Sequence, residues 1–315
     1  MEPKVAIEFR NTKCANCSTY SSSKIVYESN ITHRDLTKEV FSARRIPDRR
    51  RYTWVRCLKC GLMRSDPIAN VDYSALYETS TFDYGGEIEG LKGTYLKILK
   101  RARRNIRNTD SILEVGGGNG FFLEALVDAG FQDVSGIEPS KQAIQSSRLD
   151  IKPKMILGMM GPGKVENHKY DVVTMFHVLD HLEFPDITIK ECFESLKPGG
   201  TFVVAVHNVE SMSARILGSR SPIVDVEHTY LYSRKTGVQL FSNAGFTQIQ
   251  FSSYANRYSL AYLIQLVPIP RILKERVLKS KLSVLLSRIR FTLPLGNIWI
   301  AGVKPVRVQD LVERD

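Results

Sequence analysis

The sequence predicts a doubly wound α/β domain that follows a small cysteine-rich module. From residue 111 onward, apolar runs of strand length alternate with segments of helical periodicity, which is typical of a parallel sheet with helices on both faces. Ahead of that region stand two Cys-x-x-Cys pairs, the second of them beginning at Cys57. The strands are expected at 112–115, 133–137, about 153–157, 171–176 and 201–207.

Composition narrows the class of protein. The chain has 315 residues, of which 43% are hydrophobic and 24% charged, as in globular rather than disordered proteins. The net charge of +11 allows nucleic acid, an anionic membrane surface or a phosphorylated substrate as a partner, without choosing among them. Because the N-terminus has no apolar segment and no run reaches the ~18 apolar residues of a membrane span, we expect a cytoplasmic protein.

The first module, residues 1–70, carries four of the five cysteines as Cys14-x-x-Cys17 and Cys57-x-x-Cys60. Two such turns place four sulfurs around one ion, and four protein ligands leave zinc no open position for chemistry. The sequence therefore predicts a structural zinc ribbon. The alternative is four unrelated thiols in a reducing compartment.

The spacing between the two pairs is longer than the ~15–20 residues of a common ribbon. We therefore expect residues 20–50 to form a loop or hairpin excursion. Its arginines suit either contact with phosphates or an ordinary solvated loop; they are Arg44, Arg45, Arg49, Arg50 and Arg51.

Residues 71–110 connect the module to the sheet. They begin with a tyrosine-rich stretch and continue into a helix expected over 88–108, with a basic exposed side. Its buried stripe is expected to consist of Leu91, Tyr95, Ile98 and Leu99.

The first strand runs into a glycine-rich turn at the start of the domain predicted over 111–308. Gly116, Gly118 and Gly120 form Gly-x-Gly-x-Gly, which lets the backbone turn tightly and approach a ligand before a helix begins. Such a turn is also found as plain structure. The next strand ends at Glu138, at about the 20-residue distance of an acid that binds ribose hydroxyls.

With these residues the chain resembles the class I S-adenosylmethionine-dependent methyltransferases. The resemblance implies a Rossmann-like, seven-stranded methyltransferase sheet and S-adenosylmethionine as the cofactor. It implies that Glu114 faces the methionine part of the cofactor, that Glu138 binds the ribose, and that Met159 lies near the adenine. An NAD-type motif would need glycine at position 121, which is Phe121.

A subset of this family carries an N-terminal zinc ribbon followed by tyrosines that cover the cofactor or face the substrate. The corresponding residues here are Tyr73, Tyr77 and Tyr84, and Tyr84 is the one assigned to the cofactor. The alternative for Tyr73 and Tyr77 is aromatic packing between the ribbon and the core.

The exit of the fourth strand reads His177-Val-Leu-Asp180-His181 and resembles the family's His-Val-Leu-Glu-His. The resemblance places His177 beside the cofactor and His181 at the catalytic site. Structural histidines are the alternative. Methyltransferases that act on nucleobase amines usually carry Asn/Asp-Pro-Pro-aromatic here, and this chain does not.

The segment after the fifth strand is expected to select the substrate. Glu227-His228 matches a pair that stands before a helix in ribbon-bearing sugar C-methyltransferases, where the histidine is taken as the general base. A histidine of ordinary pKa removes protons well at neutral pH. We therefore expect methyl transfer to a small-molecule or glycosyl acceptor; the alternative is an RNA methyltransferase whose ribbon and basic surface hold RNA.

A helical insertion is expected at about 255–290, before a last antiparallel strand at 296–303. Residues 271–290 read as one basic amphipathic helix that suits an anionic membrane surface, an active-site cover or a dimer face. The layout resembles methyltransferases found with surface-polysaccharide and glycolipid assembly. The oligomeric state stays open. The apolar face of this helix comprises Leu278, Leu282, Leu285, Leu286 and Ile289.

Overall fold

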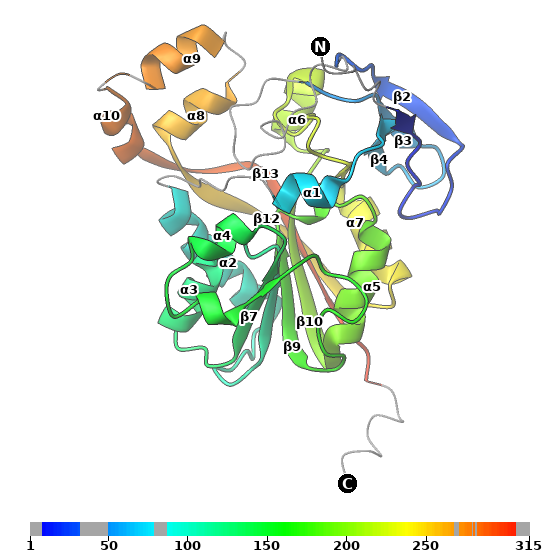
Figure 1. Ribbon diagram of the computed structural model, residues 1–315. Helices are drawn as coiled ribbons and strands as arrows, with labels where there is room; N and C mark the ends of the chain where they lie inside the picture. The colour runs from blue at the N-terminus through cyan, green and yellow to red at the C-terminus, as the bar shows by residue number, and fades with distance from the viewer. Residues whose placement is uncertain are drawn as a thin grey trace, which may run out of the picture.

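The computed structural model describes residues 8–31, 50–78, 87–267, 271–278, 280 and 282–306. Its central feature is a seven-stranded sheet, and the ribbon and the helical insertion lie at one end of that sheet (Figure 1). Tyr84 lies outside the described residues, and so do three arginines of the insert, Arg44, Arg45 and Arg49, for which phosphate contact and a solvated loop were both open.

The central sheet has the strand order β12-β13-β10-β9-β6-β7-β8. All neighbours are parallel except β13, which runs antiparallel to both β10 and β12. The chain moves outward from β6 to β8 and then returns to the other side of β6 with β9, so strand order reverses between β6 and β9. Ligands bind at such a reversal, at the carboxyl ends of the strands. The strands are β6 (Ile112–Val115), β7 (Val134–Glu138), β8 (Met155–Leu157), β9 (Tyr170–Phe176), β10 (Leu196–His207), β12 (Thr247–Ser259) and β13 (Arg290–Val303).

Alternate residues of the inner strands pack into two cores, one on each face of the sheet. Val172 and Val203 pack with α2 (Ile88–Ala102) and α3 (Phe121–Asp128). The next residues along these strands pack with α5 (Pro185–Ser195) and α7 (Arg234–Asn243) on the opposite face. Successive strand residues thus alternate between the two faces, and helices cover both faces of the sheet. This arrangement confirms the doubly wound α/β prediction. A shorter helix, α4 (Lys141–Gln145), follows β7.

The predicted strands are confirmed to within a few residues, except that β10 and β13 begin earlier. The leading helix was predicted over 88–108, but α2 ends at Ala102. Arg103 leaves the helical conformation and its side chain contacts Asp110 and Thr201 instead, which ties this end of α2 to the sheet.

The cysteine-rich module contains a four-stranded sheet of order β11-β4-β3-β2 and a short pairing of β1 (Phe9–Arg10) with β5 (Ile68–Ala69). Its strands are β2 (Ser23–Tyr27), β3 (Trp54–Cys57), β4 (Met63–Ser65) and β11 (Tyr230–Leu231). The last of these comes from the part of the chain that forms the central sheet, far from the others in sequence. The division into modules at residues 70 and 110 stays a prediction.

Buried Arg64 organises the inside of this module. Its guanidinium lies 2.9 Å from Asp66 and 2.9 Å from the Ser23 hydroxyl, and it donates to the Thr12 carbonyl. A buried charge is tolerated only when it is paired and fully hydrogen-bonded, as here.

The insertion between β12 and β13 is confirmed, but the single helix expected over 271–290 is wrong. The insertion forms α8 (Leu260–Leu266), α9 (Arg271–Leu278) and α10 (Leu282–Arg288). Ser280 interrupts the expected helix, because its hydroxyl and amide both donate to the Val277 carbonyl.

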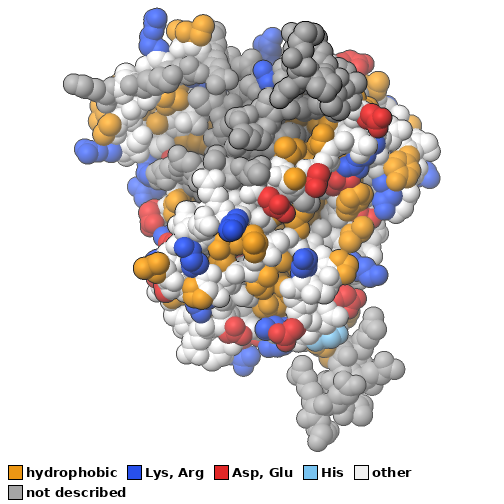
Figure 2. Space-filling model, viewed as in Figure 1, with side chains coloured by type: hydrophobic (Ala, Val, Ile, Leu, Met, Phe, Trp, Pro, Cys, Tyr) orange, Lys and Arg blue, Asp and Glu red, His pale blue; other side chains and the backbone are white. Residues whose placement is uncertain are grey.

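The expected apolar face of the insertion is mostly exposed. Leu286 is buried, whereas Leu282 and Leu285 are about half exposed. Figure 2 shows apolar and basic side chains together on the insertion at the upper left. Contact with an anionic membrane surface stays a prediction. In the part of the chain that the structure describes, no helix is long and apolar enough to cross a membrane.

Candidate active site

A glycine turn between β6 and α3 forms one wall of the main cavity. Gly116, Gly118 and Gly120 all adopt positive φ, and a Cβ at Gly116 would overlap Val178. The Glu138 carboxylate accepts the Gly118 and Ser140 amides, each at 2.8 Å. The acid that was predicted to bind the ribose is therefore held against the glycine turn.

Glu114 lies at the carboxyl end of β6 and lines the same cavity. Complete burial, with the Glu138 carboxylate nearby, raises the pKa of Glu114 well above its ordinary value. Burial also raises the pKa of Glu138, although its two amide contacts oppose that change. One Glu114 carboxylate oxygen, Oε2, has no hydrogen-bond partner among the described residues. A ligand ammonium group would supply one, which fits the α-ammonium group of the methionine part of S-adenosylmethionine.

The backbone after β8 forms another part of this wall. Gly158, Met159 and Met160 line the cavity beyond the end of the strand. This is where the family resemblance places the adenine, and the role of Met159 stays a prediction.

Four histidines also line the cavity. His177 follows β9, His181 ends the short 3-10 turn Leu179–His181, His207 ends β10 and His228 precedes β11. The ring centroids are 4.8 Å apart for His177 and His207, 5.3 Å for His207 and His228, and 4.6 Å for His228 and His181. Segments that are distant in sequence thus bring four of the chain's six histidines together.

The rings of His181 and His177 each have a hydrogen-bond contact, one with a backbone carbonyl and the other with a tyrosine hydroxyl. His181 Nδ1 lies 3.0 Å from the Glu227 carbonyl oxygen, and His177 Nε2 lies 2.8 Å from the Tyr254 hydroxyl. Burial lowers the pKa of His181 to about 4, despite the Glu227 contact, so this ring is neutral at neutral pH. The predicted pair Glu227-His228 therefore lies in the cavity beside the predicted His181.

The ribbon fixes the backbone around His228. The Ser65 hydroxyl donates to the His228 carbonyl at 3.1 Å, and the Ser65 amide donates to the Thr229 carbonyl at 2.9 Å. On the other side, the Thr229 amide donates to the Asp180 carbonyl at 2.8 Å. The His228 segment is thus held between the ribbon and the exit of β9.

The cavity has a volume of about 680 Å³, and apolar and aromatic side chains make up much of its wall. Tyr73 and Tyr77 reach it from α1 (Tyr73–Glu78), and Tyr95 reaches it from α2. Tyr258 and Tyr262 come from the end of β12 and from α8. The insertion therefore contributes to the site.

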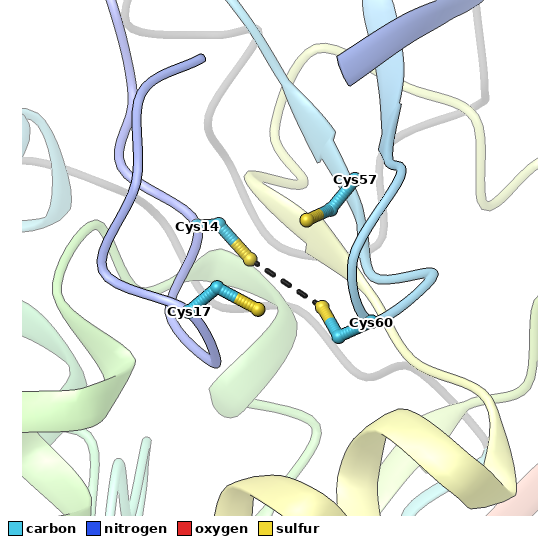
Figure 3. A group of neighbouring side chains, drawn as sticks. All are labelled: Cys14, Cys17, Cys57 and Cys60. Atoms are coloured by element: carbon cyan, nitrogen blue, oxygen red, sulfur yellow. Dashed lines mark hydrogen bonds between the residues drawn. The ribbon is translucent and has the colours of Figure 1, made fainter. Parts of the chain in front are cut away.

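The four predicted zinc ligands converge at the end of the ribbon. Their sulfur atoms lie within 4.8 Å of one another, and Cys14 Sγ is 3.6 Å from Cys60 Sγ (Figure 3). Burial, with smaller contributions from neighbouring sulfurs, raises the pKa of Cys14, and that of Cys17 to about 11. A divalent cation would offset the repulsion among four thiolates, so the cluster fits a zinc-binding module.

His207 is one of the cavity residues that sequence reasoning missed. It stands at the carboxyl end of an inner parallel strand, a position that favours ligand contact in a doubly wound sheet. That position was the available signal. The contributions of Tyr258 and Tyr262 had no comparable signal, because they depend on how the insertion folds back.

The cavity and its sheet define a methyltransferase-type site, and comparison with known proteins agrees. A family model described as "Methyltransferase domain" matches residues 88–250, which is over half of the chain. The chain therefore belongs to this family, that of the class I S-adenosylmethionine-dependent methyltransferases.

Curated relatives resemble part of the chain. A mitochondrial ubiquinone biosynthesis O-methyltransferase of Candida albicans is 27% identical over 135 residues, covering 40% of this chain and 41% of the relative. A ubiquinone biosynthesis O-methyltransferase of Proteus mirabilis is 32% identical over 95 residues, covering 28% and 38%. The chain thus spans about two fifths of the length of these relatives.

Two solved structures align with this chain at low sequence identity. An S-adenosylmethionine-dependent methyltransferase from Archaeoglobus fulgidus is 18% identical with a TM-score of 0.48, covering 74% of this chain and 100% of that one. A phosphoethanolamine N-methyltransferase from Haemonchus contortus is 14% identical with a TM-score of 0.48, covering 78% and 63%.

Proposed function

We propose that this protein transfers a methyl group from S-adenosylmethionine to a small-molecule or glycosyl acceptor that lies against His228. The proposal is supported by one observation: a single cavity is lined both by Gly116 of the glycine turn with Glu114 and Glu138, and by a cluster of histidines. The first group of residues suits the cofactor and the second suits an acceptor that must lose a proton.

The cofactor side would hold S-adenosylmethionine by three groups. Glu138 is positioned for the ribose hydroxyls, Glu114 for the cationic end, and the backbone near Met159 for the adenine. When bound, the cofactor supplies an electrophilic methyl group, whose bond to sulfur breaks with the electron pair remaining on sulfur.

On the acceptor side, His228 would act as the general base. Its ring takes the proton from the acceptor oxygen or carbon as that atom bonds to the methyl carbon. Glu227 precedes it in the cavity wall, and His181 packs against its ring. General-base catalysis of this kind contributes about 10²–10⁴-fold. The remaining acceleration would come from holding the acceptor in line.

Two lines of support bear on the acceptor. The similar curated proteins are named for O-methylation in ubiquinone biosynthesis, which favours an oxygen acceptor. The Glu227-His228 pair resembles sugar C-methyltransferases, which favours a glycosyl acceptor. A cavity of about 680 Å³ with several aromatic side chains in its wall suits a small acceptor or the end of a glycan better than an RNA strand. Basic and acidic side chains are also interspersed on the face shown in Figure 2.

We further propose that zinc at Cys14, Cys17, Cys57 and Cys60 has a structural role. Four sulfur ligands complete its coordination, so the ion itself would perform no chemistry. Its function would be to hold the ribbon, whose Ser65 contacts the backbone of His228.

The proposal is tested with methyl-labelled S-adenosylmethionine, the purified full chain and a native cell extract. Products are separated into nucleic-acid, lipid-glycan and small polar fractions. We expect label in the lipid-glycan or small polar fraction, reduced about 10²–10⁴-fold in His228→Ala. His168→Ala is the matched control, because His168 is exposed and outside the cavity wall. Label in nuclease-sensitive material would overturn the acceptor assignment.

A further inference from the structure

Three side chains at the edge of the cavity form a cluster that the proposed methyl transfer does not use. His177, Asp180 and His207 each offer one ligand atom, and these three atoms lie within 4.8 Å of one another. Both histidines line the cavity. The cluster is separate from the four cysteines, since it is built on the carboxyl ends of β9 and β10.

The sheet holds the cluster firmly. His177 follows directly on β9 with φ of 54°, a left-handed conformation that a non-glycine residue adopts at a cost and that is common at functional sites. The amide of His207 donates to Asp180 Oδ2 at 3.0 Å, which links the end of β10 to the turn after β9. The three residues are thus positioned by two adjacent inner strands.

Asp180 is the residue that points to a ligand. Its side chain is fully buried, and its second oxygen, Oδ1, has no hydrogen-bond partner in the described part of the chain. A buried carboxylate oxygen without a partner is costly unless a cation compensates it. The nearby ligand atoms are imidazole nitrogens, which together with a carboxylate make a common metal-binding set.

The outer contacts of the histidines have the form seen around metal ligands. His207 Nδ1 lies 2.9 Å from Asn297 Oδ1, and the Asn297 amide nitrogen donates to Tyr258 at 3.1 Å. Because Asn297 Oδ1 is an acceptor, Nδ1 of His207 is the donor in this contact. A metal ion would therefore bind His207 through Nε2. His177 similarly uses Nε2 toward Tyr254. Ligating histidines usually contact an outer partner through the ring nitrogen that does not bind the metal.

We propose that His177, Asp180 and His207 form a second metal site, for a divalent transition cation of the zinc type, with an open position toward the cavity. Bonds of about 2.0–2.2 Å to nitrogen and oxygen require each ligand atom to move inward by less than about 1 Å. Three protein ligands leave the cation a free coordination position, unlike the four cysteines.

The consequence for the substrate rests on the proposed function. A cation here would lie on the histidine side of the cavity, where the acceptor is expected. It favours an acceptor with an oxygen donor such as a hydroxyl group over a carbon acceptor. The cation lowers the pKa of that hydroxyl, and His228, whose ring centroid is 5.3 Å from that of His207, receives the proton.

Metal binding can be measured without any acceptor. Stripped full-length protein is dialysed against Zn²⁺ or Co²⁺, and bound metal is counted by elemental analysis. We expect two ions per chain in the wild type and one in Asp180→Asn and in His207→Gln. His168→Gln is the matched control and keeps both. In the cobalt form, thiolate-to-metal absorption persists in all these variants, while the absorption of the second ion is lost in the first two.

The wild type alone makes the test decisive, whatever the fold of the variants. One ion per chain, bound with thiolate absorption only, overturns the proposal. So do two ions in both Asp180→Asn and His207→Gln. Asn297→Ala, which removes an outer partner, is expected to weaken the second ion by about 10–100-fold. Because the readout is metal content, failure of the metal site is distinguishable from failure of the methyl transfer.

Discussion

At the residue scale, buried charges separate structural groups from functional ones. Buried Arg64 and partly buried Asp171 are each bonded to a charged partner and to neutral protein groups, and both support the frame of the molecule. Glu114 and Asp180 are fully buried, and each has one oxygen without a partner among the described residues. Glu114 lies near the end of β6 in the cavity wall, and Asp180 lies in the turn that follows β9; a ligand can complete the contacts of each.

Asp171 gives a pH prediction. Burial alone would raise its pKa, but bonds from Lys197 at 2.7 Å and from the Ser111 amide and hydroxyl outweigh this and hold the pKa below its ordinary value. A lowered pKa stabilises the fold at pH values above the unfolded-state pKa, and this contribution is lost as the pH falls through the folded-state pKa.

Asp171→Asn should therefore lower the free energy of unfolding by about 1–2 kcal/mol at neutral pH, a low value because Lys197 is 40% exposed. The difference from the wild type should stay constant down to about pH 5 and shrink below about pH 4. Urea unfolding at several pH values measures it. A difference that grows on acidification would contradict the assignment.

At the element scale, the ribbon and the sheet are interlocked. Strand β11 lies beside β4, so the methyltransferase part of the chain completes the ribbon sheet. The sequence predicted that the two cysteine pairs form one cluster, because each pair is local in sequence and the Cys-x-x-Cys spacing is diagnostic of a metal site. It did not predict the β11 pairing, because residues about 165 apart meet there and two-residue strands leave no periodic signal.

Loss of the proposed zinc should act at a distance on His228. Cys57→Ser is expected to carry one zinc ion fewer per chain and to lose a few kcal/mol of stability, seen as a fall in Tm of roughly 5–15 °C. Methyl transfer should fall with it, while affinity for S-adenosylhomocysteine stays nearly unchanged. Cys192→Ser, a buried thiol in α5 outside the cluster, should keep the zinc content. Equal zinc content and Tm in Cys57→Ser and the wild type would contradict the structural role.

At the scale of the whole molecule, three regions meet over one end of a doubly wound sheet. The glycine turn and Glu138 lie about 20 residues apart, and the geometry of the fold fixes their meeting, so sequence alone could predict them. The four histidines come from three segments, and only the arrangement of these segments in space shows that they form one cluster. The insertion was predicted, but its path over the cavity depends on packing that has no local pattern.

We propose that one cavity binds the cofactor near Glu138 and the acceptor near His228. Titration calorimetry with S-adenosylhomocysteine tests it most directly, on the wild type, Glu138→Gln and His228→Ala. Loss of a charged hydrogen bond in Glu138→Gln should weaken binding by about 10–100-fold, whereas His228→Ala should change it by less than about threefold. If the wild type does not bind, or if both variants weaken binding equally, the division of the cavity is contradicted.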